Sequence, residues 1–300
     1  MPIATPHPVT DRPPWRYAGD DVRDWRSADG RRAYRVSVAV PEGEAPAAGY
    51  PALFLLDGDL IAAPLAAGLP ALGEPVVAVL ISHAPMGAQA REARAWDYTP
   101  AIPGCDPLAD PRQPAWRNGG ADDFLALLND TIVPAVLSSH PIDRSRLTLY
   151  GHSYGALCVL RAVQAQRTPA FARYVAASPS VWWHDGAIAR LPHGDAPLSA
   201  PRIGVLVLAG TLEAWHAQAA GPDGSPASRA GGTPTLPITY GLARHWAAIP
   251  HVSVVFEAVE GGTHHSMLAQ SIVPAIDFAR CTQAAIDAAR LQPDLLETPS

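Results

Sequence analysis

Residues Gly151 to Gly155 form a Gly-x-Ser-x-Gly motif, a pattern typical of a serine nucleophile held in a sharp turn. The apolar run Leu147 to Tyr150 before the motif predicts a strand, and Ala156 to Gln166 after it predicts a helix uninterrupted by Pro or Gly. A strand, a turn and a helix in this order expose the hydroxyl of Ser153 at the edge of a sheet. The alternative is a glycine-rich turn that binds phosphate or no ligand.

A serine hydroxyl is a weak nucleophile until a base removes its proton, so the chain must also supply a histidine. His264 and His265 follow the predicted strand Val252 to Ala258, on a loop that contains Gly261 and Gly262. Metal ligation or helix capping are the alternatives for this pair. Adjacent histidines on a loop make a poor metal site unless carboxylates or cysteines support them, so we expect a general base and no metal.

A carboxylate that orients the histidine is expected on the loop after the predicted strand Ile203 to Ala209, because α/β-hydrolases order these residues as serine, acid, histidine. Glu213 is the only carboxylate between that strand and the Gly-, Ser- and Pro-rich segment 221–234. Such a group stabilises the imidazolium that forms during proton transfer. The alternative is an exposed surface glutamate. Other carboxylates lie before this strand or too near the histidines: Asp185, Asp195, Glu257 and Glu260.

Ester cleavage through a tetrahedral intermediate also needs two backbone N–H groups directed at the developing oxyanion. One is predicted to be the amide of Tyr154, which directly follows the candidate nucleophile. The other is predicted to be the amide of Asp59, just after the apolar run Ala52 to Leu56. We expect the side chain of Asp57 to hold this loop in place and to take no part in catalysis.

Composition excludes several other classes of function. The 300 residues carry a net charge of −6, which argues against a surface for nucleic acid or anionic membranes. Cys105, Cys158 and Cys281 are far apart, so neither a disulfide framework nor a zinc site is expected. No apolar run suits a signal peptide or a membrane span. We expect a cytoplasmic protein with no cofactor, no metal and no nucleic-acid or membrane partner, whose oligomeric state is not predicted.

Predicted strands and helices alternate along the chain, which indicates an α/β fold with a doubly wound, mostly parallel sheet and helices on both faces. The predicted domain spans residues 15–290 and contains a flexible insertion at 221–234. A disordered Pro-rich tail is predicted at 1–14 and a C-terminal tail at 291–300. The predicted strands are 22–27, 33–40, 52–56, 75–81, 147–150, 174–177, 203–209 and 252–258; the helices are 121–137, 154–167, 242–249 and 265–280.

Six further motifs accompany the Gly-x-Ser-x-Gly turn: Leu55–Gly58 (LLDG), Arg94–Pro100 (RAWDYTP), Gly119–Phe124 (GGADDF), Pro141–Asp143 (PID), Ser178–Trp183 (SPSVWW) and Gly261–Ser266 (GGTHHS). In this order, over about residues 30–275, they resemble the esterase D-like branch of the α/β-hydrolases, closest to ferric-siderophore esterases of the enterobactin and salmochelin type. In the family's Gly-x-x-His-x-Ser pattern the base falls on His264 rather than His265.

This resemblance implies an α/β-hydrolase fold without a large cap domain and a serine esterase that cleaves ester or lactone bonds through an acyl-enzyme. The implied substrate is a small-molecule ester, in the nearest relatives a catecholate trilactone siderophore. Candidate substrate-binding residues are Arg94, Trp96, Trp182 and Trp183. The alternatives are that the tryptophans fill the core and that Arg94 forms an ion pair with Asp97.

Other functions remain open from the sequence. Within the same fold these are a general carboxylesterase, a thioesterase acting on a substrate such as S-formylglutathione, and an acyltransferase. From another class, a catalytically silent binding protein with this fold would usually lack Ser153 or His264, and both are present. Some siderophore esterases use serine and histidine alone, so both a triad with Glu213 and a dyad are possible.

Overall fold

The protein is described here by a computed structural model, which covers residues 15–17, 22–68, 74–105, 108–165, 171–191, 202–215, 218–220, 226–228 and 232–291. The predicted tail at 1–14 lies outside these residues, as does the predicted tail at 291–300 except for Leu291. Most of the predicted insertion at 221–234 also lies outside them.

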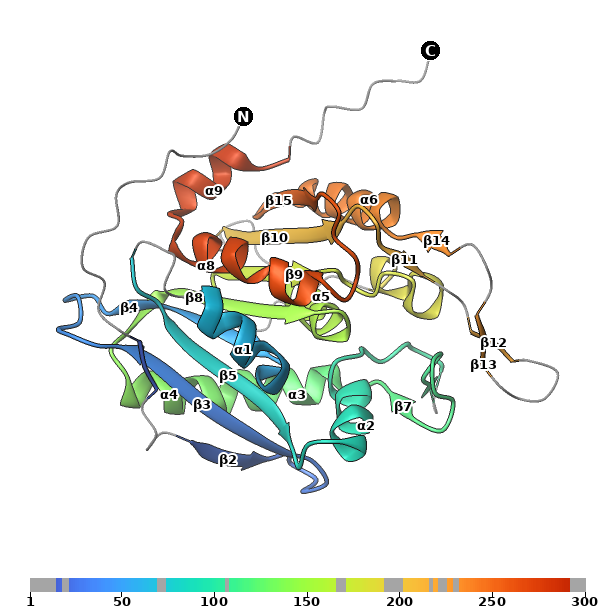
Figure 1. Ribbon diagram of the computed structural model, residues 1–300, viewed down its shortest axis with the longest axis horizontal. Coiled ribbons are helices and arrows are strands. Elements are labelled where there is room, and N and C mark those ends of the chain that lie inside the picture. Colours follow the sequence, from blue (N-terminus) through green and yellow to red (C-terminus); the bar gives the residue numbers. More distant parts are fainter. Residues whose placement is uncertain are drawn as a thin grey trace, which may run out of the picture.

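The strands of the central sheet in the described residues are β1 (Trp15–Tyr17), β2 (Arg23–Arg26), β3 (Ala33–Pro41), β4 (Tyr50–Leu56), β5 (Val77–Ala84), β8 (Ile142–His152), β9 (Arg173–Ala177), β10 (Ile203–Gly210) and β15 (Val252–Val259). They are arranged in the order β1-β3-β5-β4-β8-β9-β10-β15 (Figure 1). Strand β2 pairs with residues 33–36 of β3, and β1 pairs with residues 39–41 of the same strand. From β5 to β15 every neighbouring pair is parallel, whereas β3 runs antiparallel to β5. The predicted mostly parallel sheet is confirmed.

The inner parallel strands β4, β9 and β10 are buried throughout their length, which explains their largely apolar sequences. Every residue of β4 is buried, and successive side chains enter different cores. Phe54 packs in one core, while Leu53 and Leu55 pack in the other. Burying an apolar side chain of this size contributes roughly 1.5–3 kcal/mol to folding, so these strands anchor the loops at their carboxyl ends.

Helices cover both faces of the sheet. One core lies beneath α1 (Gly58–Gly68), α7 (Met267–Gln270), α8 (Ile272–Arg280) and α9 (Gln283–Ala289). The other lies beneath α2 (Ala88–Asp97), α3 (Ala121–Leu127), α4 (Val133–Ser139), α5 (Tyr154–Ala165) and α6 (Leu236–Ala247). Figure 1 shows α1 and α8 in front of the sheet and α3, α4 and α5 behind it. The described residues form no large cap domain over this arrangement.

Some predicted helices differ from those in the structure. The predicted helix 121–137 is interrupted by a π-helical turn at Leu128–Ile132. The predicted helix 265–280 is divided at Ser271 into α7 and α8, and the buried Ser271 hydroxyl is 2.7 Å from the Tyr150 hydroxyl. Helix α6 begins at Leu236, six residues earlier than predicted, because Pro237 is well accommodated in a first helical turn. Helices α1, α2 and α9 were not predicted.

Short two-stranded pairs lie beyond the carboxyl ends of the parallel strands, on the side to which β8 and β10 point in Figure 1. These are β6 (Leu108–Ala109) with β7 (Arg117–Asn118), β11 (Ala214–Trp215) with β14 (Thr233–Pro234), and β12 (Gln218–Ala220) with β13 (Pro226–Ser228). Ligands of open α/β sheets bind at this edge. None of the helices in the described residues has the length and hydrophobicity needed to cross a membrane.

Two loops at this edge are held together by a close contact between glycines. Gly210 ends β10, and a Cβ atom added there would lie 2.2 Å from the carbonyl oxygen of Gly262. The Leu212 amide also donates a hydrogen bond to that oxygen, and the Thr211 amide donates one to the carbonyl of Val259. The loop that carries Glu213 is thus fixed against the loop that carries His264.

Gly210→Ala is therefore expected to lower the free energy of unfolding by about 1–3 kcal/mol, because the backbone of one loop must move to admit a methyl group. Gly241→Ala provides the matched control, because a Cβ atom in this part of α6 meets no atom within 4 Å. That substitution should raise stability by about 0.5–1 kcal/mol, as alanine is the better helix former. Urea unfolding of both variants measures the difference; equal effects would contradict the assigned contact.

Candidate active site

Ser153 occupies the turn between β8 and α5 with φ of 60°, a left-handed conformation that is unfavourable for a residue with a side chain. Gly151 makes this turn possible, since a Cβ atom there would lie 2.3 Å from the carbonyl carbon and oxygen of Gly155. A Cβ atom at Gly155 would meet its nearest neighbour, Asp57 Oδ2, at an ordinary 3.5 Å. Of the two motif glycines, only Gly151 is required by packing.

The structure brings His264 to Ser153. His264 Nε2 lies 3.0 Å from Ser153 Oγ, and His264 Nδ1 lies 3.2 Å from Glu213 Oε2. Because a carboxylate only accepts hydrogen bonds, the proton of a neutral His264 belongs on Nδ1, and Nε2 is free to accept the serine proton. His265 is exposed and makes no part of this chain of contacts.

Glu213 is buried and its carboxylate is fully engaged. Its Oε1 accepts hydrogen bonds from the Ser178 hydroxyl and from the Gly210 amide, both at 2.6 Å. Burial alone would raise the pKa of Glu213, but the hydrogen bonds from His264, Ser178 and the Gly210 amide outweigh it and lower the pKa. Glu213 therefore stays ionised beside the imidazole, as a group that orients and stabilises an imidazolium must.

The Ser178–Trp183 motif places two serines that the sequence did not identify as functional. Ser178 holds the acid, as described above, and the Ser180 hydroxyl lies 3.2 Å from Ser153 Oγ. Both follow β9, which is the strand next to β8 in the sheet. In the sequence the two serines directly follow the predicted strand that ends at Ala177, and this was the available signal. That they lie near the nucleophile follows only from the strand order, which the sequence does not give.

The two predicted oxyanion donors lie at the starts of neighbouring helices. Tyr154 is the first residue of α5 and Asp59 the second of α1. First-turn amides have no acceptor within their helix, so they can donate to an anion. The preceding strands, β8 and β4, pair in parallel, which places both helix starts at the same edge of the sheet. Gly58 allows α1 to begin there, because a Cβ atom would lie 2.7 Å from Leu80 Cβ.

Arg94 lies beneath the nucleophile turn. Its Nε and Nη2 donate to the Asp57 carboxylate at 2.7–2.9 Å, and Nη2 also donates to the His152 carbonyl at 3.2 Å. The alternative ion pair of Arg94 with Asp97 is wrong. Asp97 instead accepts hydrogen bonds from Tyr34 and His83, and its Oδ1 lies 2.9 Å from Arg32 Nε. The Arg94–Asp57 pair joins the loop after β4 to the turn after β8, as expected for Asp57.

The two predicted tryptophans of the Ser178–Trp183 motif differ in burial. Trp183 is fully buried, at 0% exposure, and donates from Nε1 to Asn118 Oδ1, so its predicted substrate contact is wrong. Trp182 is partly exposed near the turn, with its ring centroid 6.1 Å from that of Tyr154. It stacks on Trp215, with centroids 3.3 Å apart and planes at 6°. Trp215 was missed, although it stands only two residues after Glu213.

A cationic side chain also lies beside the turn. The Arg112 guanidinium carbon is 3.8 Å from the centre of the Tyr154 ring, a cation–π contact. Asp110 fixes this pair, because its Oδ2 accepts a hydrogen bond from the Tyr154 hydroxyl and its Oδ1 lies 3.9 Å from Arg112 Nε. Arg112 was not singled out from the sequence, because it follows the weak strand β6 in an irregular segment.

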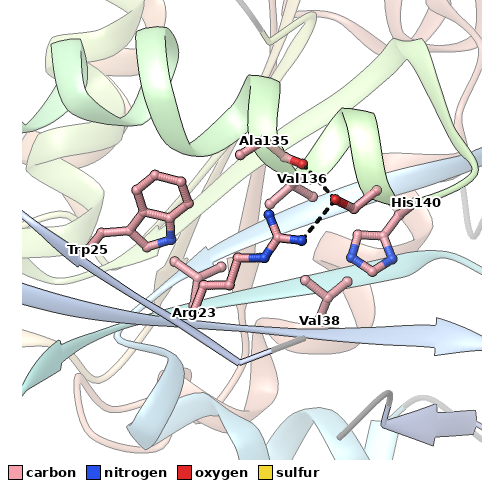
Figure 2. A pocket seen from close by; sticks show the side chains of 8 residues that line it. Arg23, Trp25, Val38, Ala135, Val136 and His140 are labelled. Carbon is pink, nitrogen blue, oxygen red and sulfur yellow. Dashed lines mark hydrogen bonds between the residues drawn. The ribbon is translucent and has the colours of Figure 1, made fainter. Parts of the chain in front are cut away.

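Two hollows lie apart from these residues. Trp96 lines a cleft of about 470 Å³ together with Arg32 and Arg117, and none of Ser153, Glu213 or His264 contributes to its lining. This cleft is separate from the nucleophile, and substrate binding by Trp96 stays a prediction. Figure 2 shows a second hollow between β3 and α4, where Arg23 donates to Ser139. Its volume of about 10 Å³ fits no more than a water molecule.

The described residues contain no cluster of three or more His, Cys, Asp or Glu side chains arranged to hold a metal ion. The chemistry available at the turn is instead that of a hydroxyl, an imidazole and a carboxylate in series. Such a series moves a proton from the serine to the histidine while the carboxylate balances the charge. This arrangement suits acyl transfer.

Comparison with known proteins places the chain in a family. The sequence model of the family described as "Putative esterase" matches residues 27–219, more than half of the chain. The chain belongs to this esterase family. It is 39% identical to the apo-salmochelin esterase of Escherichia coli O6:H1 over 161 residues, which are 52% of this chain and 49% of that protein. The match thus spans about half the length of the E. coli esterase.

Two further esterases extend the comparison. The chain is 29% identical to the ferri-bacillibactin esterase of Bacillus subtilis over 210 residues, 66% of this chain and 72% of that protein. Among solved structures, the enterobactin and salmochelin hydrolase IroE superposes with a TM-score of 0.61 at 28% identity, covering 87% of this chain and 94% of IroE. The chain has the α/β-hydrolase fold that its sequence predicts.

Glu213→Gln should reduce the loss of stability at acidic pH. In the folded chain the pKa of Glu213 is below its ordinary value of 4.5, so the unfolded chain binds this proton first as the pH falls. The stabilisation is complete above pH 4.5 and is lost as the pH falls through the lower folded pKa. Glutamine does not titrate, so the free energy of unfolding should fall less steeply between about pH 5 and pH 3.

Urea unfolding at a series of pH values measures this slope. Glu257→Gln serves as the control, because burial and the neighbouring Asp277 raise the pKa of Glu257. Its removal should therefore make the free energy of unfolding fall more steeply toward acidic pH, the opposite of the change expected for Glu213→Gln. If Glu213→Gln leaves the slope of the wild type unchanged, the carboxylate is not held in its ionised form as described.

Proposed function

We propose that this chain is a serine esterase in which Ser153 is the nucleophile, His264 the general base and acid, and Glu213 the third member of a triad. The observation that carries the proposal is the unbroken series of contacts from Ser153 Oγ through His264 to Glu213, at 3.0 and 3.2 Å. The strained turn at Ser153 supports it, because such strain is concentrated at functional sites.

In the proposed reaction Ser153 Oγ attacks the ester carbonyl while His264 Nε2 takes the serine proton. The carbonyl oxygen becomes an oxyanion that the amides of Tyr154 and Asp59 stabilise. The carbon–oxygen bond of the ester then breaks, and His264 returns the proton to the leaving alcohol, which leaves an acyl-enzyme on Ser153. A water molecule then attacks this acyl group while His264 Nε2 takes its proton. His264 passes that proton to Ser153 Oγ as the acyl–oxygen bond breaks, which releases the acid and restores the free serine.

We further propose that the ester or lactone bond belongs to a catecholate trilactone siderophore. The names of the relatives supply the substrate class, and the surroundings of the turn support it. The stacked pair of Trp182 and Trp215 offers a flat apolar surface to an aromatic ring. Arg112 adds a positive charge beside Tyr154, although the chain as a whole carries −6. Cleavage in the cytoplasm, after uptake, is part of this proposal and is tested by cell fractionation.

Substitution of the three proposed catalytic residues tests the mechanism. Ser153→Ala should abolish labelling by a fluorophosphonate and lower kcat by several orders of magnitude, and His264→Ala should have a similar effect on kcat, because nucleophile and base act as a unit. Glu213→Gln should lower kcat by about 10²–10⁴-fold. Rates are measured on p-nitrophenyl acetate with each variant shown to be folded.

His265→Ala is the matched control, as the neighbouring exposed histidine should be dispensable. Loss of activity in His265→Ala with retention in His264→Ala would overturn the assigned base. A loss of less than about tenfold in Glu213→Gln would mean that Ser153 and His264 work as a dyad.

A comparison of substrates tests the siderophore proposal. The kcat/KM for enterobactin-type trilactones, iron-free and ferric, should exceed those for p-nitrophenyl acetate and S-formylglutathione. Trp182→Ala should lower kcat/KM for the trilactone by about 5–10-fold, through loss of about 1–1.5 kcal/mol of ring stacking, while hydrolysis of the small acetate changes little. If the trilactones are inert and a simple ester or thioester is cleaved well, the substrate proposal fails and the serine chemistry stands.

A further inference from the structure

His152 lies between the nucleophile and the loop of the proposed base. It directly precedes Ser153, its side chain is buried at 8% exposure, and its Nε2 lies 2.9 Å from the backbone carbonyl oxygen of His264. A carbonyl oxygen only accepts hydrogen bonds, so His152 Nε2 carries the proton and donates it. No step of the proposed reaction uses this side chain.

The backbone carbonyl of His264 accepts its hydrogen bond from a side chain, unlike the carbonyls of the two neighbouring residues. The carbonyls on either side, those of Thr263 and His265, accept hydrogen bonds from the Met267 and Leu268 amides at the start of α7. In the described residues the carbonyl between them is held by the imidazole of His152 instead. This bond fixes the backbone at the residue whose side chain must face Ser153.

The two imidazole rings also touch, with centroids 4.9 Å apart and planes at 38°. The charged or titratable groups that act on His152 are His264, Arg94 and Glu213. Burial, then the positive charges of His264 and Arg94, lower the pKa of His152 to about 3, although the His264 carbonyl and Glu213 favour the charged form. His152 therefore remains neutral when His264 becomes an imidazolium.

We propose that His152 is a positioning residue for the general base: its Nε2–H, bonded to the His264 carbonyl, holds His264 Nε2 at 3.0 Å from Ser153 Oγ. The inference rests on the proposed serine esterase function. Because His152 and Ser153 are adjacent in the chain, the nucleophile and the base loop are attached to the same turn. Arg94 extends the attachment to the loop after β4 through its bonds to the His152 carbonyl and Asp57.

Two substitutions separate the hydrogen bond from the bulk of the ring. His152→Phe keeps a ring but removes the donor, whereas His152→Gln places an amide N–H close to the position of Nε2. His152→Phe should lower kcat on p-nitrophenyl acetate by about 10–100-fold with KM changed less than about twofold, because a small misplacement of a catalytic group costs rate rather than binding. His152→Gln should keep kcat within about fivefold of the wild type.

The rate of fluorophosphonate labelling provides a readout that a purely structural role would not move, because it depends on removal of the Ser153 proton by a correctly placed base and not on binding of the ester. In His152→Phe the His264 loop loses its hydrogen bond to His152, so we expect this rate to fall in parallel with kcat, whereas in His152→Gln it should stay within about fivefold of the wild type. Circular dichroism and urea unfolding establish that each variant is folded.

The inference is overturned if folded His152→Phe keeps at least half of the wild-type kcat and labelling rate, or if folded His152→Gln loses as much rate as His152→Phe. Failure of the proposed function looks different. In that case wild-type protein neither reacts with the fluorophosphonate nor hydrolyses the ester, and Ser153→Ala is indistinguishable from it.

Discussion

The left-handed residue Ser153, at the end of the central strand β8, constrains the arrangement of the whole candidate active site. Ser153 has φ of 60°, and Gly151 leaves no Cβ atom against the backbone of Gly155, which allows α5 to start within two residues of β8. Burial of the strands on both faces holds this turn in place, since a parallel strand with two cores cannot shift without exposing apolar side chains. The stability of the sheet thus maintains the strain at the nucleophile.

The remaining residues of the site come to this turn from separate strands. Strand β9 brings Ser178 and Ser180, β10 brings Glu213, β15 brings His264 and β4 brings Asp59. Close approaches of backbone, at Gly210 with Gly262 and at Gly58 with Leu80, fix these loops to one another and to the sheet. Polar contacts then set the orientation of single groups, as Ser178 does for Glu213 and His152 does for the His264 carbonyl.

Much of this arrangement could be predicted from the sequence, and the parts that could not have identifiable physical reasons. Strands such as Tyr50–Leu56 are apolar throughout, so their burial was evident, and the motifs at Ser153 and His264 are local in the chain. Helix α1 contains Pro64 and α2 is largely polar, so neither shows the usual helical pattern. The environments of Trp183 and Arg94 depend on partners 65 and 37 residues away, Asn118 and Asp57, which no local pattern indicates.

The stacked indoles of Trp182 and Trp215 give the site an optical signal of its own. Trp215 belongs to β11, which pairs with β14, whereas Trp182 follows β9, so the stack joins two independently anchored segments. Two indoles stacked at 3.3 Å cover one face of each other, and tryptophan fluorescence depends on how far the ring is exposed to water. Separation of the two segments would expose both faces even when every strand of the sheet stays in place. Movement at the mouth of the site can therefore be followed by spectroscopy of the unlabelled protein.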